Sequence, residues 1–184
     1  MSVPPPSLQQ ETIDAAQGSW RVLIGRRDAP GYFDTGLRGL VSSFIALLAS
    51  IAITLGAAAL TRTDAGVSSL SLVVTNAVLY AALVAASWAV LRAVGKSEKF
   101  IPFLAVDNWL NAFISIILAL AGLVGLSGEM VMFAAIVAGL AARINNARLI
   151  AELNVGQIVM LMIAQVIGVF IGLGVLGVFI PVPV

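Results

Sequence analysis

Five long, predominantly apolar segments limit the folds that this chain of 184 residues can adopt. They cover residues 37–60, 67–91, 101–126, 130–146 and 155–180. A transmembrane helix needs about 20 mostly apolar residues. With 60% apolar and 10% charged residues, the chain has too little polar surface for a soluble fold of this size. The sequence therefore predicts an all-α polytopic membrane bundle with five transmembrane helices.

The basic residues are distributed unevenly among the gaps between these segments. Of the ten Lys and Arg residues, only Arg62 lies in the gap after the first segment. The other nine lie before or at the very start of the first segment, in the second gap, or at the end of the fourth segment and in the gap after it. They are Arg21, Arg26, Arg27, Arg38, Arg92, Lys96, Lys99, Arg143 and Arg148. Cytoplasmic loops of membrane proteins carry an excess of Lys and Arg. The pattern predicts a cytoplasmic N-terminus and a C-terminus on the opposite side.

Residues 1–36 are expected to form a cytoplasmic segment, and residues 37–184 the bundle. Ser7 and Gln10 fit a capping box at the start of a helix. The helix that follows carries an apolar stripe at helical spacing: Ile13, Ala16, Trp20, Leu23 and Ile24. This amphipathic helix is suited either to the headgroup region of a membrane or to packing on the bundle as an ordinary cytoplasmic helix. A turn at residues 28–31 should end it.

The third and fourth segments leave two arrangements open. Their uninterrupted apolar runs cover only residues 112–126 and 130–142, which suits two crossings or a re-entrant hairpin. Glu129, in the connection between them, favours two crossings. A hairpin tip inside the hydrocarbon would bury its carboxylate at a cost of at least about 2 kcal/mol.

Small residues recur every fourth position along several spans, as close helix packing in a membrane requires. One ladder in the second span includes Ala81 and Ala85, and another in the fifth includes Gly168 and Gly172. We expect these ridges to seal one bundle. The alternative for the Gly168/Gly172 face is self-association.

Polar residues at membrane depth are the candidate functional residues. One predicted cluster lies near the cytoplasmic ends of the third and fourth spans: Asp107, Asn108, Asn111, Arg143, Asn146 and Arg148. It fits a polar pocket for a headgroup, a small solute or a proton, or else an interfacial salt bridge of Asp107 with Arg143 or Arg148. Gln165 and Asn76 lie deeper in their spans and fit interhelical hydrogen bonds.

Other chemistry is excluded by composition. The chain contains no histidine and no cysteine, which removes imidazole and thiolate metal sites and the usual nucleophile pairs. Phosphate-binding glycine loops and nucleophile-elbow motifs are absent too. A net charge of +1 gives no argument for nucleic-acid binding. The sequence thus predicts a protein that is not an enzyme and that uses no metal or cofactor.

Four short motifs carry a resemblance to known proteins: residues 20–26 (Trp-Arg-Val-Leu-Ile-Gly-Arg), 32–34 (Tyr-Phe-Asp), 42–44 (Ser-Ser-Phe) and 107–109 (Asp-Asn-Trp). With a cytoplasmic segment ahead of five spans, the chain resembles the Yip1-like family and uncharacterised five-span inner-membrane proteins of proteobacteria. The Asp-Leu-Tyr-Gly-Pro type of motif of eukaryotic Yip1 members is missing. The resemblance implies a fold and an inner-membrane location, and it implies no substrate.

Three functions remain open from the sequence. The first is a non-catalytic membrane protein that acts through lipids, other membrane proteins or self-association. The second is a small-solute or proton-coupled carrier that uses Asp107 and Arg143. The third is an accessory subunit of a larger membrane complex.

Overall fold

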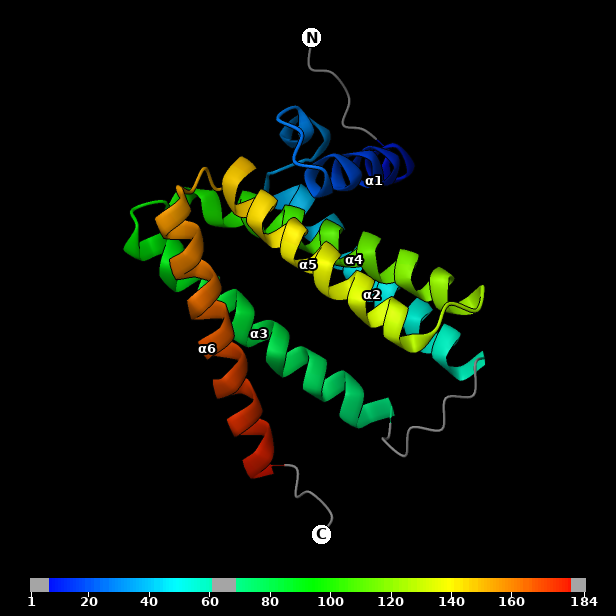
Figure 1. Ribbon diagram of the computed structural model, residues 1–184. Coiled ribbons are helices and arrows are strands. Elements are labelled where there is room, and N and C mark those ends of the chain that lie inside the picture. The colour runs from blue at the N-terminus through cyan, green and yellow to red at the C-terminus, as the bar shows by residue number, and fades with distance from the viewer. Residues whose placement is uncertain (1–6, 61–68, 180–184) are drawn as a thin grey trace. The chain divides into compact units, whose positions relative to one another are not determined.

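A computed structural model describes residues 7–60 and 69–179, and these residues form helices and short connections (Figure 1). The α-helices are α1 (Leu8–Leu23), α2 (Leu37–Leu60), α3 (Ser69–Ala93), α4 (Phe100–Leu123), α5 (Gly128–Leu149) and α6 (Val155–Phe179). Two short 3₁₀ helices, η1 (Ala29–Tyr32) and η2 (Ser97–Lys99), precede α2 and α4. The predicted all-α class is confirmed. Arg62 and the outer ends of the second and fifth predicted segments lie outside the described residues.

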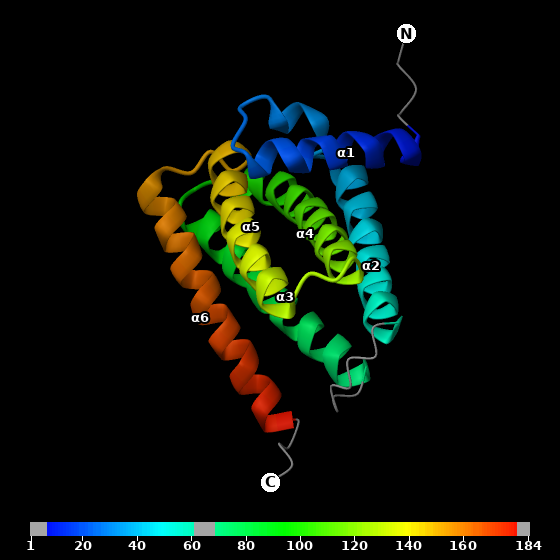
Figure 2. The ribbon, with the colours of Figure 1, turned by 45° about the vertical axis from the view of Figure 1, so that its right-hand side comes forward.

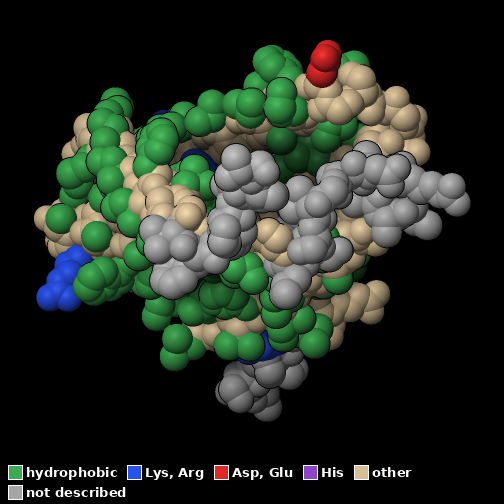
Figure 3. Space-filling view, turned by 90° about the horizontal axis from the view of Figure 1, so that it is seen from below, with side chains coloured by type: hydrophobic (Ala, Val, Ile, Leu, Met, Phe, Trp, Pro, Cys, Tyr) green, Lys and Arg blue, Asp and Glu red, His purple; other side chains and the backbone are tan. Residues whose placement is uncertain are grey.

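Five of the six α-helices, α2 to α6, are long and apolar enough to cross a membrane. Many of their large apolar side chains are exposed, among them Leu48, Phe133 and Phe170. Figure 3 shows one face of the molecule on which hydrophobic side chains predominate and charged ones are few. In water such surfaces would be unfavourable, whereas lipid tails are as apolar as these side chains.

The third and fourth segments are continuous helices of full length. α4 has 24 residues and α5 has 22, which corresponds to about 36 and 33 Å of helix. α4 begins at Phe100, seven residues before Asp107, and also contains most of the apolar run 112–126. A helix can pass through polar residues that interrupt an apolar run, so the helix is longer than the run. Gly125, with φ of +90°, ends α4, and the Ser127 hydroxyl accepts the Met130 amide 3.4 Å away to begin α5. Glu129 lies exposed in the first turn of α5.

The chain forms two compact units. The first comprises residues 1–63 and 101–152 and contains α1, η1, α2, α5 and nearly all of α4. The second comprises residues 64–100 and 153–184 and contains α3, η2 and α6. The N-terminal segment therefore shares a unit with three of the long apolar helices, whereas the expected boundary between residues 36 and 37 would separate it from them.

In the first unit, α1 lies across the ends of the long helices (Figures 1 and 2). The core of this unit joins α1 and η1 to α4 and α5; its members include Ala15, Val22, Phe33, Trp109 and Ala142. Gly18 permits this packing, because a Cβ atom there would lie 2.7 Å from the Phe33 ring. Gly25 follows the end of α1 and has φ of +72°. This is the left-handed conformation that glycine commonly adopts after a helix.

The face that α1 uses for packing differs from the predicted one. Its buried residues are Glu11, Ala15, Gly18, Ser19 and Val22, whereas Ile13, Trp20 and Ile24 are exposed. The helix thus packs on the bundle through another face and leaves its large apolar side chains exposed, as the headgroup region, the other of the two predicted settings, would require. Close approach of α1 to the helix ends requires small side chains, and size outweighs hydrophobicity here.

In the second unit, α3 and α6 pack through small residues, but not the predicted set on α3. A Cβ atom on Gly168 would lie 3.1 Å from the Ala82 carbonyl oxygen, and one on Gly172 would lie 3.3 Å from the Leu79 side chain. The predicted role of Gly168 and Gly172 in close packing is thus supported. Ala81 and Ala85 are exposed and lie beside the ridge of α3 that meets α6, so their predicted packing is not part of this contact. The ridge that meets α6 contains Ala82 and Ala86, each one residue further along α3.

Candidate functional site

The predicted polar cluster divides into groups with different partners. Asp107 on α4 accepts a hydrogen bond of 3.0 Å from the Asn111 amide, one helical turn away. The Arg143 guanidinium attracts the Asp107 carboxylate from α5, and the Asn146 side chain hydrogen-bonds to it. Of the two predicted partners of Asp107, the structure therefore favours Arg143.

Two asparagines of the cluster connect helices. Asn108, which is fully buried, donates to the Ser43 hydroxyl on α2 across 3.1 Å. Asn146 donates to the backbone carbonyl of Phe103 on α4, also across 3.1 Å. Interhelical hydrogen bonds of this kind typically contribute about 0.6 kcal/mol each in membrane proteins. These asparagines hold α2, α4 and α5 in register.

Arg148 is directed at the end of α1. Its guanidinium donates to the Gly25 carbonyl across 3.2 Å, and the neighbouring Asn145 amide donates to the Leu23 carbonyl across 3.2 Å. The last carbonyl groups of a helix have no donors within the helix. Here α5 supplies donors to carbonyl groups at the end of α1. The predicted pairing of Asp107 with Arg148 is wrong, because Arg148 binds this helix end.

The deeper polar residues belong to the second unit. Gln165 on α6 is buried and donates to the Ser87 hydroxyl on α3 across 3.0 Å. This bond agrees with its predicted interhelical role. Asn76 lies exposed on α3.

A pocket of about 310 Å³ lies in the first unit, between α1, α2 and α4. None of the six residues of the predicted cluster lines it. α1 contributes Leu8, Glu11, Thr12, Ala16 and Ser19; α2 contributes Ser42, Ile45, Ala46 and Ala49; and α4 contributes Trp109, Ala112, Phe113 and Ile116. The lining is mostly apolar, with one carboxylate, as is common in ligand-binding pockets.

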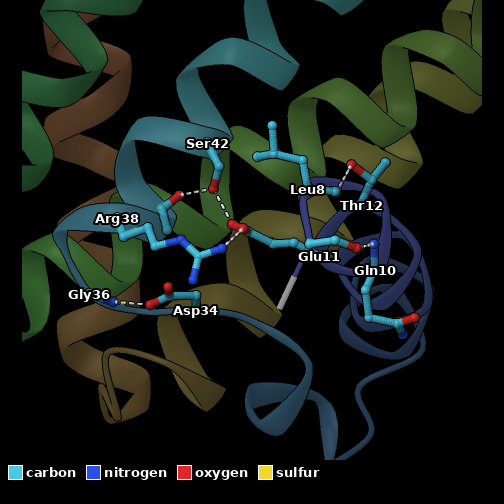
Figure 4. Close-up of polar contacts among 10 residues, drawn as sticks. Leu8, Gln10, Glu11, Thr12, Asp34, Gly36, Arg38 and Ser42 are labelled. Carbon is cyan, nitrogen blue, oxygen red and sulfur yellow. Dashed lines mark hydrogen bonds and ion pairs between the residues drawn. The ribbon is translucent and has the colours of Figure 1, made fainter. Parts of the chain in front are cut away.

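Glu11 is the charged residue of this pocket (Figure 4). Its side chain is 5% exposed and points toward α2, where the Ser42 hydroxyl donates to Oε1. The Arg38 guanidinium lies 3.5 Å from Oε2 and is 43% exposed. Although Arg38 is near, Oε2 accepts no hydrogen bond within the described part of the chain. The buried carboxylate thus joins α1 to α2 while leaving one oxygen unsatisfied.

Glu11 is not among the candidate residues predicted from the sequence, because it lies off the apolar stripe of this helix. The available signal was the run of small residues at Ala15, Gly18 and Ser19, which lie on one side of the helix together with Glu11 and Val22. A search for small residues, as applied to the spans, would have predicted that this side of α1 packs.

Asp28 stabilises the turn after α1. Desolvation raises the pKa of its carboxyl, but hydrogen bonds to Arg26 and to the backbone, together with the positive charges of Arg21 and Arg26, outweigh this and hold the pKa below its ordinary value. Arg21 also lies over the Tyr32 ring, 4.5 Å from its centre. These contacts fix η1 against α1.

No protein-family model, curated protein or solved structure matches this chain. The geometry described above therefore carries the functional argument.

Proposed function

We propose that the chain is a multi-pass protein of a cell inner membrane that acts, without catalysis, by binding lipid or membrane-protein partners. The observation that carries this proposal is the largely apolar pocket between α1 and two helices capable of spanning a membrane. A pocket with this lining favours the apolar part of an amphiphilic ligand, which a bilayer would supply. The proposed location agrees with the inner-membrane location that the Yip1-like resemblance implies.

The distribution of charge supports an orientation with the N-terminus in the cytoplasm. Arg38 lies at the start of α2, Arg92 in the last turn of α3 and Arg148 in the last turn of α5. With five crossings, these three positions share one side of the membrane, and the positive-inside rule makes that side cytoplasmic. Glu129, in the connection between α4 and α5, then faces water on the other side.

The contacts of Asp107 favour a structural role over a carrier function. Its carboxylate already interacts with Asn111, Arg143 and Asn146, which leaves little capacity for a transported solute or proton. Intramembrane charges that are paired in this way are common as interfacial ion pairs. The pocket is lined by a separate set of residues.

The outer face of α1 favours a protein partner as a second candidate function. Ile13, Trp20 and Ile24 are exposed and lie about 180° around the helix from the buried stripe. Large apolar residues on the outer face of a docked helix are typical of contact surfaces. An accessory subunit of a membrane complex could use them.

Cysteine labelling tests the proposed topology, and the chain has no native cysteine to remove. Ser97, before α4, and Val124, before α5, are both exposed, so Ser97→Cys and Val124→Cys should be tolerated. An impermeant maleimide should label the two variants from opposite sides of the membrane. Labelling of both from the cytoplasm would contradict five crossings.

Native mass spectrometry of the full chain in lipid nanodiscs tests the proposed action. Retained lipid adducts on a protein without stoichiometric partners would support lipid binding. A stable hetero-oligomer that loses its partner in the triple variant Ile13→Ser, Trp20→Ser, Ile24→Ser would instead support the accessory-subunit function. A chain that retains neither lipid nor partner would contradict the proposal.

A further inference from the structure

Four of the residues that line the pocket under α1 are polar: Glu11, Thr12, Ser19 and Ser42. The Thr12 hydroxyl donates to the Leu8 carbonyl across 2.8 Å, and the Ser42 hydroxyl donates to Glu11 (Figure 4). Glu11 Oε2 lies 3.5 Å from the Arg38 guanidinium, and both this oxygen and the Ser19 hydroxyl have almost no exposed surface. The polar atoms are therefore engaged or enclosed, and the surface left to an occupant is almost wholly apolar.

Water is a poor occupant of such a pocket. The volume of about 310 Å³ corresponds to about ten waters in the liquid, but an enclosed water needs two to four polar partners. The apolar lining does not supply them. If the pocket stayed empty, the atoms of its walls would lose dispersion contacts. An apolar occupant is therefore favoured over both water and a void.

The exposed part of the lining lies at the depth of lipid tails. On α2, Ile45 is 58% exposed, and Ala49 is exposed too. These residues lie eight and twelve positions after Leu37, the first residue of α2, which corresponds to about 12 and 18 Å of helix rise. A head-group layer is about 5–8 Å thick. A bilayer that α2 crosses, as proposed, therefore surrounds both side chains with alkyl chains.

The shape of the pocket follows the two long helices. Its lining runs from Ser42 to Ala49 on α2 and from Trp109 to Ile116 on α4, about 10 Å along each helix. Small side chains on all three helices leave this space open: Ala16, Ser19, Ala46, Ala49 and Ala112. An alkyl chain can fill such an elongated space along its length, whereas one apolar side chain of a protein partner would fill only part of it.

We propose that this pocket holds one alkyl chain of a bilayer lipid and leaves the head group of that lipid outside. The chain lies beneath α1 and fills the space between α1, α2 and α4. Because the polar groups of the lining are engaged or enclosed, the pocket does not select among head groups. The inference rests on the proposed lipid interaction and specifies which part of the lipid is bound.

Trp109 lines the pocket and provides a direct test, because bromine atoms on a lipid chain quench tryptophan fluorescence on contact. Trp20 and Trp88 are exposed, and Trp20→Phe with Trp88→Phe leaves Trp109 as the reporter. The full chain is placed in nanodiscs in which phosphatidylcholine is replaced stepwise by phosphatidylcholine with dibrominated chains. Trp109 itself is only 8% exposed, so strong quenching is expected when a chain enters the pocket.

A matched pair of variants separates the pocket from the lipid around the bundle. Ala49→Phe should block the pocket and remove most of the quenching. The control Ala52→Phe carries the same substitution at an exposed position of α2 outside the lining, and it should leave the quenching unchanged. Ala46→Leu fills the pocket with an aliphatic side chain and should act like Ala49→Phe, which excludes an effect peculiar to the phenylalanine ring.

The head group is tested with phosphatidylglycerol that carries the same dibrominated chains. The part of the quenching that Ala49→Phe removes should be equal for the anionic and the zwitterionic lipid. A marked preference for either head group in this part would overturn the inference. Equal quenching in Ala49→Phe, Ala52→Phe and the parent protein would also overturn it, because Trp109 would then respond only to lipid around the bundle.

Native mass spectrometry of the unsubstituted chain from nanodiscs distinguishes failure of this inference from failure of the proposed function. Retained lipid adducts without quenching that depends on the pocket would reject the pocket as the lipid site and leave the proposed function standing. A chain that shows no such quenching and retains neither lipid nor a protein partner would reject both.

Discussion

Arg38→Gln should loosen α1 more than Glu11→Gln does, although both substitutions remove the same ion pair. The two partners differ in exposure, at 43% for Arg38 and 5% for Glu11. Removal of the arginine leaves a buried carboxylate whose charge only the Ser42 hydroxyl offsets within the contacts described above. Removal of the glutamate charge leaves a guanidinium that water can reach.

The magnitudes follow from this asymmetry. Loss of one partner from a buried pair costs about 3–5 kcal/mol, and the partial exposure of Arg38 reduces this to about 2 kcal/mol for Arg38→Gln. Glu11→Gln keeps an acceptor for Ser42 and should cost about 0.5 kcal/mol. The double variant contains no buried charge and should resemble Glu11→Gln. These costs raise the equilibrium constant for opening of α1 about 30-fold in Arg38→Gln and about twofold in Glu11→Gln.

Hydrogen exchange followed by mass spectrometry measures this opening directly in nanodiscs, because docking of α1 protects its amides. Peptides from residues 8–23 report on α1, and peptides from α5 serve as the internal reference. Arg27→Gln is the matched control, since Arg27 is an exposed arginine in the connection between α1 and η1. Equal acceleration by Glu11→Gln and Arg38→Gln would refute the reasoning, as would a double variant that opens as readily as Arg38→Gln alone.

Three further predictions concern other parts of the chain. Gly168→Val should destabilise the α3–α6 pair by about 1–3 kcal/mol in thermal unfolding, because its Cβ would crowd the Ala82 carbonyl, whereas Gly174→Val, in open space, should not destabilise it. Asp107→Asn should reduce the monodisperse fraction on size exclusion, as loss of a structural contact does; full yield with lost solute uptake would support a carrier. Because the pKa of Asp28 is lowered in the folded state, its stabilising contribution is present above the ordinary value of 3.8 and should fade below it. Exchange of α1 should therefore accelerate in that range, and Asp28→Asn should abolish the acceleration.

The long helices could be predicted from sequence because a bilayer imposes a simple requirement of length and apolarity. The orientation of α1 could not. The apolar stripe left two settings open, the headgroup region of a membrane and packing on the bundle, and the second follows the rule for soluble proteins, in which large apolar side chains face inward and polar ones outward. Beside a bilayer, apolar surface gains little by packing on other apolar surface, and close approach of backbones decides the contact. Gly18 and Ala15 therefore pack inward while Trp20 faces outward. The pocket and its carboxylate follow from this inversion, and so they too escaped prediction.

The alanine ridge of α3 that packs against α6 lies one residue further along the helix than the ladder singled out in the sequence. Its sequence offers two equivalent ridges of alanine, one through Ala81 and Ala85 and the other through Ala82 and Ala86, and size alone cannot choose between them. Ser87 can. It lies about 160° around the helix from Ala85 but about 100° from Ala86. Packing through the second ridge brings Ser87 within reach of Gln165, whereas packing through the first would turn Ser87 away. The hydrogen bond itself contributes little, about 0.6 kcal/mol, but a buried glutamine that lost this partner would cost about 1–3 kcal/mol. Avoidance of that cost selects the ridge, so the combined variant Gln165→Leu, Ser87→Ala should remove the preference while preserving the small-residue contacts.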